Sequence, residues 1–269
     1  GSEMCIRDRI IPEKKIIDFR SDTVTQPTVE MRATMANAKV GDDVWEEDYT
    51  VKDLETEMAV LFSKEAALFC PSGTMTNQIA IRVHTKLGDE VICDKLSHIY
   101  NYEGGGLAAN SGVSARLVEG DCGRITIDQI KSNINPDDVH FPRTSLVCLE
   151  NTVNKGGGVC YDYNQMKDIS SYCRSNNLML HLDGARVFNA LIAKSESACD
   201  YGKLFDSVSV CLSKGLGAPI GSVLIGGTEF IREAKRVRKS LGGGMRQVGY
   251  LAAAGHYALK NHMYSHKII

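Results

Sequence analysis

Hydrophobic residues follow two different spacings along most of the chain. Short runs in which nearly every residue is apolar predict buried β-strands at residues 66–70, 90–93, 115–118, 145–149, 178–182, 207–212 and 222–225. Elsewhere, apolar residues recur every three to four positions, as at Val51, Leu54 and Met58, and this spacing predicts helices. Helices are also expected at residues 74–85, 163–175, 228–240 and 246–261.

The order of these elements indicates the fold class. Strands that are apolar throughout and that alternate with helices are typical of a mainly parallel sheet covered on both faces. We therefore expect an α/β fold with a mainly parallel seven-stranded sheet. Ligands of such sheets bind beyond the carboxyl ends of the strands. Ser72, Asp183 and Lys214 all fall at such ends.

Composition and charge exclude several classes of protein. The 269 residues are 43% hydrophobic and 24% charged, which is typical of a globular protein. A formal net charge of -2 gives no overall attraction to nucleic acid or to anionic membrane. No run approaches the roughly 20 apolar residues of a membrane helix, so we expect a soluble, cytoplasmic protein. Five basic side chains could form a nucleic-acid patch but are interpreted as the solvated face of a helix: Arg232, Lys235, Arg236, Arg238 and Lys239.

The nine cysteines and seven histidines give no metal-binding pattern. No pair of cysteines has the C-x-x-C spacing, and no H-E-x-x-H motif occurs. We expect reduced thiols that act as small core residues, and no metal site. Residues 1–9 resemble a translated sequencing adapter, so we interpret residues 1–15 as an artefactual or disordered leader.

The clearest chemical signal is a pair of polar residues that follow apolar runs. Lys214 comes after the run at residues 208–212, and Asp183 ends an earlier run. A lysine at a strand edge can hold the aldehyde of pyridoxal phosphate as a Schiff base, and a carboxylate at a neighbouring strand end can keep the pyridine nitrogen protonated. Each residue alone also fits an ordinary loop or turn. Together, beside glycines that allow close approach of the backbone to a ligand, they favour this cofactor.

Two further groups would suit the same cofactor. Ser72, Gly73 and Thr74 open a predicted helix, and the free amides and dipole of a helix start favour a phosphate. A plain N-cap would explain the same residues. His98 follows a strand, where it is either structural or placed to stack on an aromatic cofactor and exchange protons.

Six motifs, in order between about residues 16 and 260, resemble those of the low-specificity L-threonine aldolases. They are DFRSDTVT at 18–25, VGDDV at 40–44, PSGTMTNQ at 71–78, HLDGAR at 181–186, LSKGL at 212–216 and LGGGMRQ at 241–247. That family has the aspartate-aminotransferase fold, fold type I of the pyridoxal-phosphate enzymes. The resemblance implies a cofactor-binding large domain over residues 16–261.

The resemblance also implies how the matching residues would bind the cofactor. Lys214 would hold pyridoxal 5'-phosphate, Asp183 would pair with the pyridine nitrogen, and His98 would stack on the ring. The phosphate would be held by the three residues that open the predicted helix: Ser72, Gly73 and Thr74.

The implied reaction is cleavage of L-threonine or L-allo-threonine to glycine and acetaldehyde. Ser21 and Arg186 would bind the substrate carboxylate, and Arg186 would also lie near the cofactor. The family is oligomeric, so a homodimer or homotetramer with sites at the subunit interface is expected. Arg246 is expected to serve a neighbouring subunit.

Two departures from the family affect the expected activity. Val153 stands where many relatives carry a histidine that reaches the substrate hydroxyl, and valine cannot donate, accept or titrate. The family also continues into a small C-terminal domain with another carboxylate-binding arginine. Residues 262–269 are therefore expected to be the truncated start of that domain, and the chain to be impaired. Another enzyme of the fold, either a β-eliminating lyase or an aminotransferase, and a non-catalytic cofactor-binding fragment stay open as alternatives.

Overall fold

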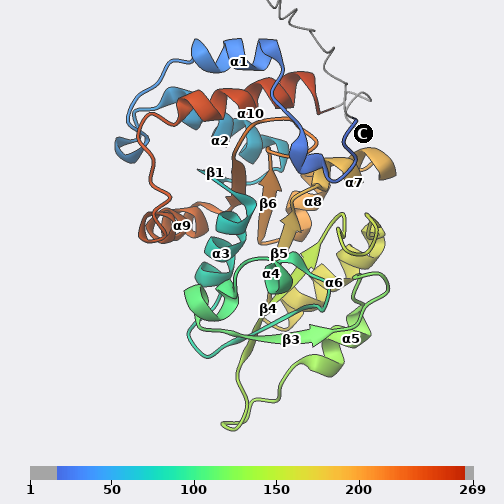
Figure 1. Ribbon diagram of the computed structural model, residues 1–269. Helices are drawn as coiled ribbons and strands as arrows, with labels where there is room; N and C mark the ends of the chain where they lie inside the picture. The colour runs from blue at the N-terminus through green and yellow to red at the C-terminus, as the bar shows by residue number, and fades with distance from the viewer. Residues whose placement is uncertain (1–16, 264–269) are drawn as a thin grey trace, which may run out of the picture.

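The computed structural model describes residues 17–263, which form a seven-stranded sheet between helices (Figure 1). The predicted leader at residues 1–15 and residues 264–269 of the predicted C-terminal segment lie outside the described residues. The strands occur in the order β1-β7-β6-β5-β4-β2-β3 across the sheet. Their bounds are β1 (Ala66–Cys70), β2 (Glu90–Asp94), β3 (Ser114–Val118), β4 (Thr144–Glu150), β5 (Met179–Gly184), β6 (Ser207–Cys211) and β7 (Ser222–Gly226).

The prediction of a mainly parallel sheet is confirmed. The pairs β2–β3, β2–β4, β4–β5 and β5–β6 are parallel, whereas β7 pairs antiparallel with both β1 and β6. A parallel connection needs a crossover of about a dozen residues or more, usually through a helix. Residues 212–221 are too few for that crossover, so β6 and β7 form a hairpin.

The helices include all those predicted and several that were not. They are α1 (Val29–Ala36), α2 (Tyr49–Leu61), α3 (Gly73–His84), α4 (His98–Asn101), α5 (Ile127–Asn133), α6 (Tyr163–Ser175), α7 (Val187–Lys194), α8 (Ala198–Leu204), α9 (Thr228–Ser240) and α10 (Gly249–Asn261). Helices α6 and α9 have the predicted bounds, whereas α10 begins at Gly249 and not at residue 246. The missed helices are α4, which has four residues, and α1, α5, α7 and α8, which have seven or eight. All are too short for a clear periodic pattern.

Apart from edge strand β3, the strands are buried on both faces, which explains their continuous apolar runs. Along β1, Leu68 packs with residues of α3 and α9, whereas its neighbour Phe69 belongs to the cluster formed with α2, α6, α8 and α10. The same division separates Leu224 from Ile225 on β7. Helix α1 lies along α10, and α10 along α2 (Figure 1). No helix in residues 17–263 is long and apolar enough to cross a membrane.

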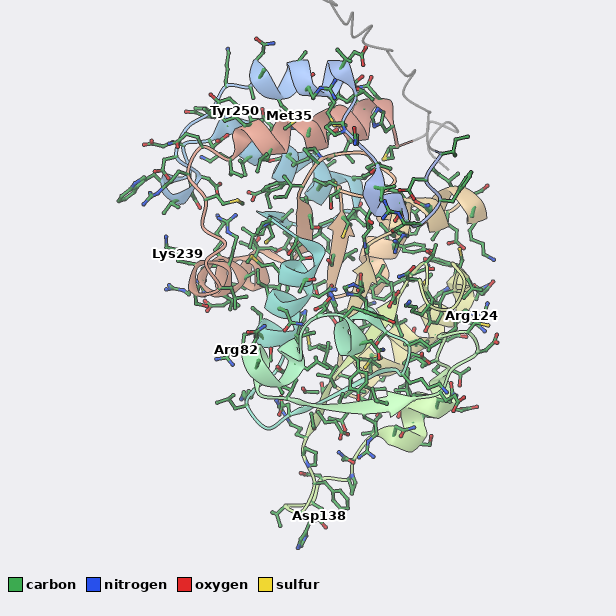
Figure 2. All side chains as sticks on the ribbon, viewed as in Figure 1. Met35, Arg82, Arg124, Asp138, Lys239 and Tyr250 are labelled. Carbon is green, nitrogen blue, oxygen red and sulfur yellow. The ribbon has the colours of Figure 1, made fainter. Side chains whose placement is uncertain are left out.

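One residue of the predicted solvated basic face is buried instead. Arg238 donates to the carbonyl oxygen of Phe69 at 2.6 Å and to Oδ2 of Asp43 at 2.9 Å. A buried guanidinium is stable only when it is paired and hydrogen-bonded, so Arg238 fastens α9 to β1 and to the turn at Asp43. Lys239, labelled on the outer side of α9 in Figure 2, is exposed, as are the other three basic residues.

We expect Leu182→Ala to lower the free energy of unfolding by about 2–5 kcal/mol, because it leaves a cavity under a fully buried position of β5. The matched variant Leu87→Ala changes a side chain that is 75% exposed and should stay within about 0.5 kcal/mol of the wild type. Urea unfolding measures both. Equal losses in the two variants would show that the core is not organised around this strand.

Candidate active site

Four chain segments meet at the carboxyl edge of the parallel strands. Strand β5 brings Asp183, β6 leads into the loop with Lys214, β1 leads into α3, and β2 leads to His98 at the start of α4. A nitrogen of His98 and carboxylate oxygens of Glu103 and Asp183 all lie within 4.8 Å of one another. Lys214 is close enough to affect the pKa of His98. The predicted cofactor residues of these segments therefore surround one place.

Asp183 is a buried carboxylate with defined donors. Its Oδ2 accepts a hydrogen bond from Nδ2 of Asn77 at 2.8 Å, and its Oδ1 accepts one from the amide of Ala185 at 3.1 Å. Buried charge requires such donors. Nδ2 of Asn77 also donates to Oε1 of Glu103 at 2.8 Å, so one side-chain amide joins two carboxylates.

His98 is held by two carboxylates that sequence reasoning missed. Its Nδ1 lies 2.9 Å from Oε1 of Glu103, and its backbone amide donates to Oε2 of Glu150 at 2.8 Å. The hydrogen bond with Glu103 raises the pKa of His98 and outweighs the opposite effect of burial. Glu103 is fixed in turn by Gln78, whose Nε2 donates to its Oε2 at 2.6 Å. The ring therefore has a fixed position.

Glu150 and Val153 lie in the same segment but in different surroundings. Glu150 is the register partner of Asp183 on the neighbouring strand. Burial, followed by the charge of Asp183, raises the pKa of Glu150 to about 7. Val153 is buried, and its side chain packs over Gly123 and Gly156. The position at which the family resemblance implied a histidine thus contributes to the core of this chain.

The start of α3 offers donors for an anion. The hydroxyl of Ser72 accepts from the amide of Met75 at 3.2 Å, as an N-cap does. The amides of Gly73 and Thr74 are the first of the helix and have no partner within it. A Cβ at Gly73 would lie 2.5 Å from Sγ of Cys211, so the close approach requires glycine. The Ser222 hydroxyl, 3.6 Å from that Cβ position, is buried without a hydrogen-bond partner among residues 17–263.

Lys214 lies in a loop whose backbone is fixed. Its carbonyl oxygen accepts from Oγ1 of Thr25 at 2.7 Å and from the amide of Gly217 at 2.8 Å. Within the described part of the chain, its Nζ forms no hydrogen bond or ion pair. The amine of Lys214, the carboxylate of Asp183 and the free amides of α3 match the aldehyde, ring nitrogen and phosphate of pyridoxal phosphate. These residues therefore fit the predicted cofactor.

Arg186 already has a carboxylate partner. Its Nε and one terminal nitrogen donate to the two carboxylate oxygens of Asp22 at 2.7 and 2.6 Å. Burial tends to raise the pKa of Asp22, but Arg186 and then Lys214 outweigh it, and the net pKa is lowered. Ser21 is exposed, and its hydroxyl accepts from the amide of Thr23 at 3.2 Å. Asp22, the chain neighbour of Ser21, therefore links Arg186 to the segment that contains Ser21.

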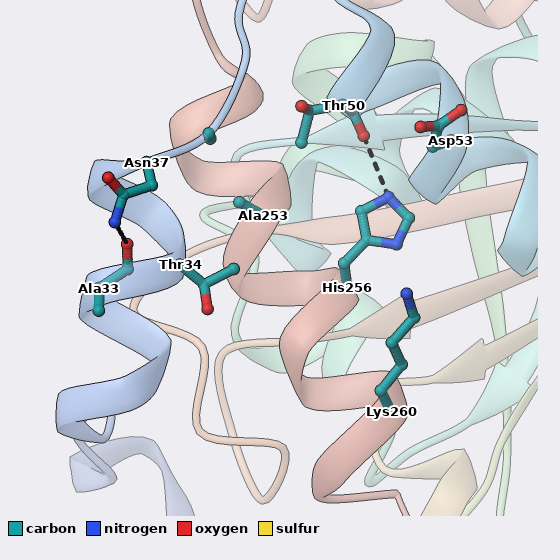
Figure 3. Close-up of a pocket in the computed structure, with 9 residues that line it drawn as sticks. Ala33, Thr34, Asn37, Thr50, Asp53, Ala253, His256 and Lys260 are labelled. Atoms are coloured by element: carbon teal, nitrogen blue, oxygen red, sulfur yellow. Dashed lines mark hydrogen bonds between the residues drawn. The ribbon is translucent and has the colours of Figure 1, made fainter.

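Arg246 and the cavity between α1, α2 and α10 both lie away from these site residues. Arg246 is exposed and forms a 2.8 Å ion pair with Asp42. A cavity of about 580 Å³ lies between α1, α2 and α10, lined by Thr34, Asp53, His256 and Lys260 among others (Figure 3). His256 is turned toward α2, where it hydrogen-bonds the carbonyl oxygen of Thr50 (Figure 3). The cavity contains none of the predicted site residues.

Sequence signals existed for the missed residues. Asn77 and Asp22 lie within two of the family-like motifs, and Glu150 begins the segment that contains Val153. Glu150 also directly follows the strand predicted at residues 145–149. Glu103, in a loop with no motif, had no such signal.

Comparison with known proteins gives the family of the chain. Residues 18–267 match the model of a family described as beta-eliminating lyase. The chain is 45% identical over 249 residues to the low specificity L-threonine aldolase of Escherichia coli O157:H7, covering 92% of this chain and 74% of that protein. It is 46% identical over 244 residues to protein R102.4 of Caenorhabditis elegans, covering 90% of this chain and 59% of that protein.

A solved structure gives the same result. The structure of a putative L-allo-threonine aldolase from Listeria monocytogenes superposes with a TM-score of 0.78 at 29% identity, covering 88% of this chain and 65% of that one. The chain thus spans between about three fifths and three quarters of the length of these proteins. By its family match and these identities, the chain belongs to the beta-eliminating lyase family and, within it, groups with the low-specificity L-threonine aldolases, as its motifs predicted.

Proposed function

We propose that the protein is a pyridoxal-phosphate-dependent lyase that cleaves L-threonine or L-allo-threonine to glycine and acetaldehyde. The observation that carries the proposal is the meeting of Asp183, His98, Lys214 and the start of α3 at one edge of the sheet. The names of the relatives, low-specificity L-threonine aldolases, support the substrate class.

Bound pyridoxal phosphate would supply the electron sink for breaking the Cα–Cβ bond of the substrate. Lys214 would hold the aldehyde carbon and give way to the substrate amine. Asp183 would keep a proton on the ring nitrogen, since its carboxylate is already oriented by Asn77. His98 would cover one face of the ring, held there by Glu103.

Binding of the two anionic groups would use different parts of the site. The amides at the start of α3, with the hydroxyls of Ser72 and Thr74, would bind the cofactor phosphate. Arg186 and Ser21 would bind the substrate carboxylate. Because Asp22 occupies the guanidinium of Arg186, the substrate carboxylate would have to use its remaining donors or displace Asp22.

Val153 would affect selectivity at the β-carbon, or the rate. Threonine and allo-threonine have opposite configurations at the β-carbon, where the hydroxyl and methyl groups exchange places, so a polar contact to the hydroxyl is one means of discriminating between them. Val153 provides none, being packed against glycines. A homodimer or homotetramer, a cytoplasmic location and a role of Arg246 at a subunit interface stay predictions from the family resemblance.

Lys214→Ala should abolish covalent attachment of pyridoxal phosphate. In the wild type, we expect borohydride reduction to fix the cofactor on Lys214, detected by its absorption and by peptide mapping. Lys239→Ala, which removes an exposed lysine of α9, should label as the wild type does. Label on another lysine, with the Lys214→Ala protein still coloured, would rule out this assignment.

Asp183→Asn should lower the turnover rate at least about 100-fold, on the order of 3 kcal/mol of barrier, because a neutral amide cannot hold the proton of a pyridinium ring. Cofactor binding should largely persist. Acetaldehyde release measures the rate, and release of ammonia with a keto acid would instead indicate the β-eliminating alternative. Asp162→Asn, which keeps an N-cap on α6, is the matched control. Near-normal turnover of Asp183→Asn would exclude the proposed role.

Glu103→Gln should lower the pKa of His98, because the hydrogen bond to Glu103 is the main cause of its elevation. The hydrogen-bonded pair of His98 and Glu103 stabilises the fold fully at a pH below about 6.5, the pKa of a histidine in the unfolded chain. This stabilisation is lost as the pH rises through the higher pKa of His98 in the folded protein. NMR titration of the His98 ring measures the shift. Glu119→Gln, which removes an exposed partner of Lys95, should leave His98 unchanged. An unchanged pKa in Glu103→Gln would contradict the assignment.

A further inference from the structure

A line of hydrogen bonds runs from Asp183 along the interface between α3 and the sheet. Asn77 Oδ1 lies 3.1 Å from Nε2 of His181, whose Nδ1 lies 2.8 Å from Oγ of Ser207. The same hydroxyl lies 2.8 Å from Nε2 of His84. The spacings place these residues on one face of each element. His181 and Asp183 are two residues apart on β5, and Asn77 and His84 are seven residues, about two turns, apart on α3.

The direction of this line is fixed at its Asp183 end. The Asn77 amide group has two hydrogens and one oxygen that could exchange places. Its nitrogen lies 2.8 Å from oxygens of both Asp183 and Glu103. With the amide reversed, a carbonyl oxygen would face two carboxylates, so the nitrogen must point to them. The oxygen then faces His181, whose Nε2 must donate.

The two histidines continue the same direction. A neutral imidazole has one donor and one acceptor nitrogen, so a ring of His181 that donates through Nε2 accepts at Nδ1 from the hydroxyl of Ser207. Ser207 has then used its hydrogen and accepts from Nε2 of His84. Burial lowers the pKa of His181 to about 3 and that of His84 to about 4, which keeps both rings neutral at pH 7.

The line has a defined far end. The ring of His84 stacks on Phe230 with centroids 4.5 Å apart and an interplanar angle of 15°. Ser207 and His181 are fully buried, so none of the intermediate donors can be replaced by bulk water. Every hydrogen in the line therefore points toward Asp183, and aligned donors polarise one another in a buried setting.

We propose that His181 and Ser207 are positioning residues that act through Asn77 to orient the Asp183 carboxylate and concentrate its negative charge toward the ring nitrogen of the cofactor. The inference rests on the proposed function, because it gives Asp183 a cationic ring to face. Asn77 and Asp183 would touch the reacting system, whereas His181 and Ser207 would act only through them.

The hydrogen positions can be tested without cofactor. In protein labelled with 15N-histidine, long-range proton–nitrogen spectra distinguish the two neutral imidazole forms and the cation. We expect His181 and His84 as neutral forms with the proton on Nε2 between pH 6 and 8. A proton on Nδ1 of His181, or a cationic ring, would reverse or break the line and overturn the inference.

The effect on the cofactor is tested with matched serine variants. Ser207→Ala removes the central hydroxyl, whereas Ser170→Ala removes another buried hydroxyl, which donates to the carbonyl oxygen of Leu204 at 2.5 Å. With pyridoxal phosphate labelled by 15N in the ring, the nitrogen shift reports the proton on that ring. We expect Ser207→Ala to shift the signal toward the unprotonated form and weaken cofactor binding about 10-fold, and Ser170→Ala to match the wild type.

A second pair of variants separates hydrogen bonding from packing. His181→Gln can still donate to Asn77 and should keep most of the wild-type nitrogen signal, whereas His181→Phe fills the space without donating and should lose it. If the wild-type protein binds the cofactor and all four variants give the wild-type nitrogen spectrum, the inference is overturned and the proposed function is left intact. A wild type that fails to bind cofactor would overturn the proposed function, whatever the histidine spectra show.

Discussion

The side-chain amide of Asn77 is the interaction on which the site depends. It holds two buried carboxylates, Asp183 and Glu103, that would otherwise repel each other near a third, Glu150. Glu103 in turn fixes His98, and Asp183 defines where a cationic ring could lie. Concentrating negative charge in a buried place is costly unless donors and a positive partner are present. The arrangement is therefore complementary to a cationic ligand.

Most of the strands could be predicted because, apart from β3, they are buried on both faces. Residues such as Leu68 and Phe69 point to opposite helical layers, so the apolar runs were continuous and easily found. The direction of β7 was not predicted, because apolarity does not distinguish a parallel from an antiparallel strand. Loop length alone carried that information. The short helices were not predicted for a different reason, because seven or eight residues give only about two turns of the periodic pattern.

The site was predictable only where a strand end or a motif indicated a residue. Asp183 and Lys214 follow apolar runs, so their meeting at one edge could be inferred from topology. The partner of Arg186 could not, because the pairing with Asp22 joins residues 164 positions apart. For Arg238 the sequence pattern gave a wrong prediction. The residue has the spacing of a solvated helix face, but it is buried because the carboxylate of Asp43 and the carbonyl oxygen of Phe69 accept its hydrogen bonds in the fold. Such pairings are properties of the packed structure and leave no local pattern.

The hairpin between β6 and β7 restricts how Lys214 can move. Its loop is closed by the bond from Leu212 to Gly221, crossed by the bond from Ala218 to Leu212, and attached to the N-terminal segment through Thr25. These hydrogen bonds restrain the backbone of the loop. Movement of the amine is left to the rotatable bonds of one flexible side chain, and such rotations take place in picoseconds to nanoseconds for exposed groups. Replacement of one amine by another at this position would thus be a local exchange that needs no opening of the fold.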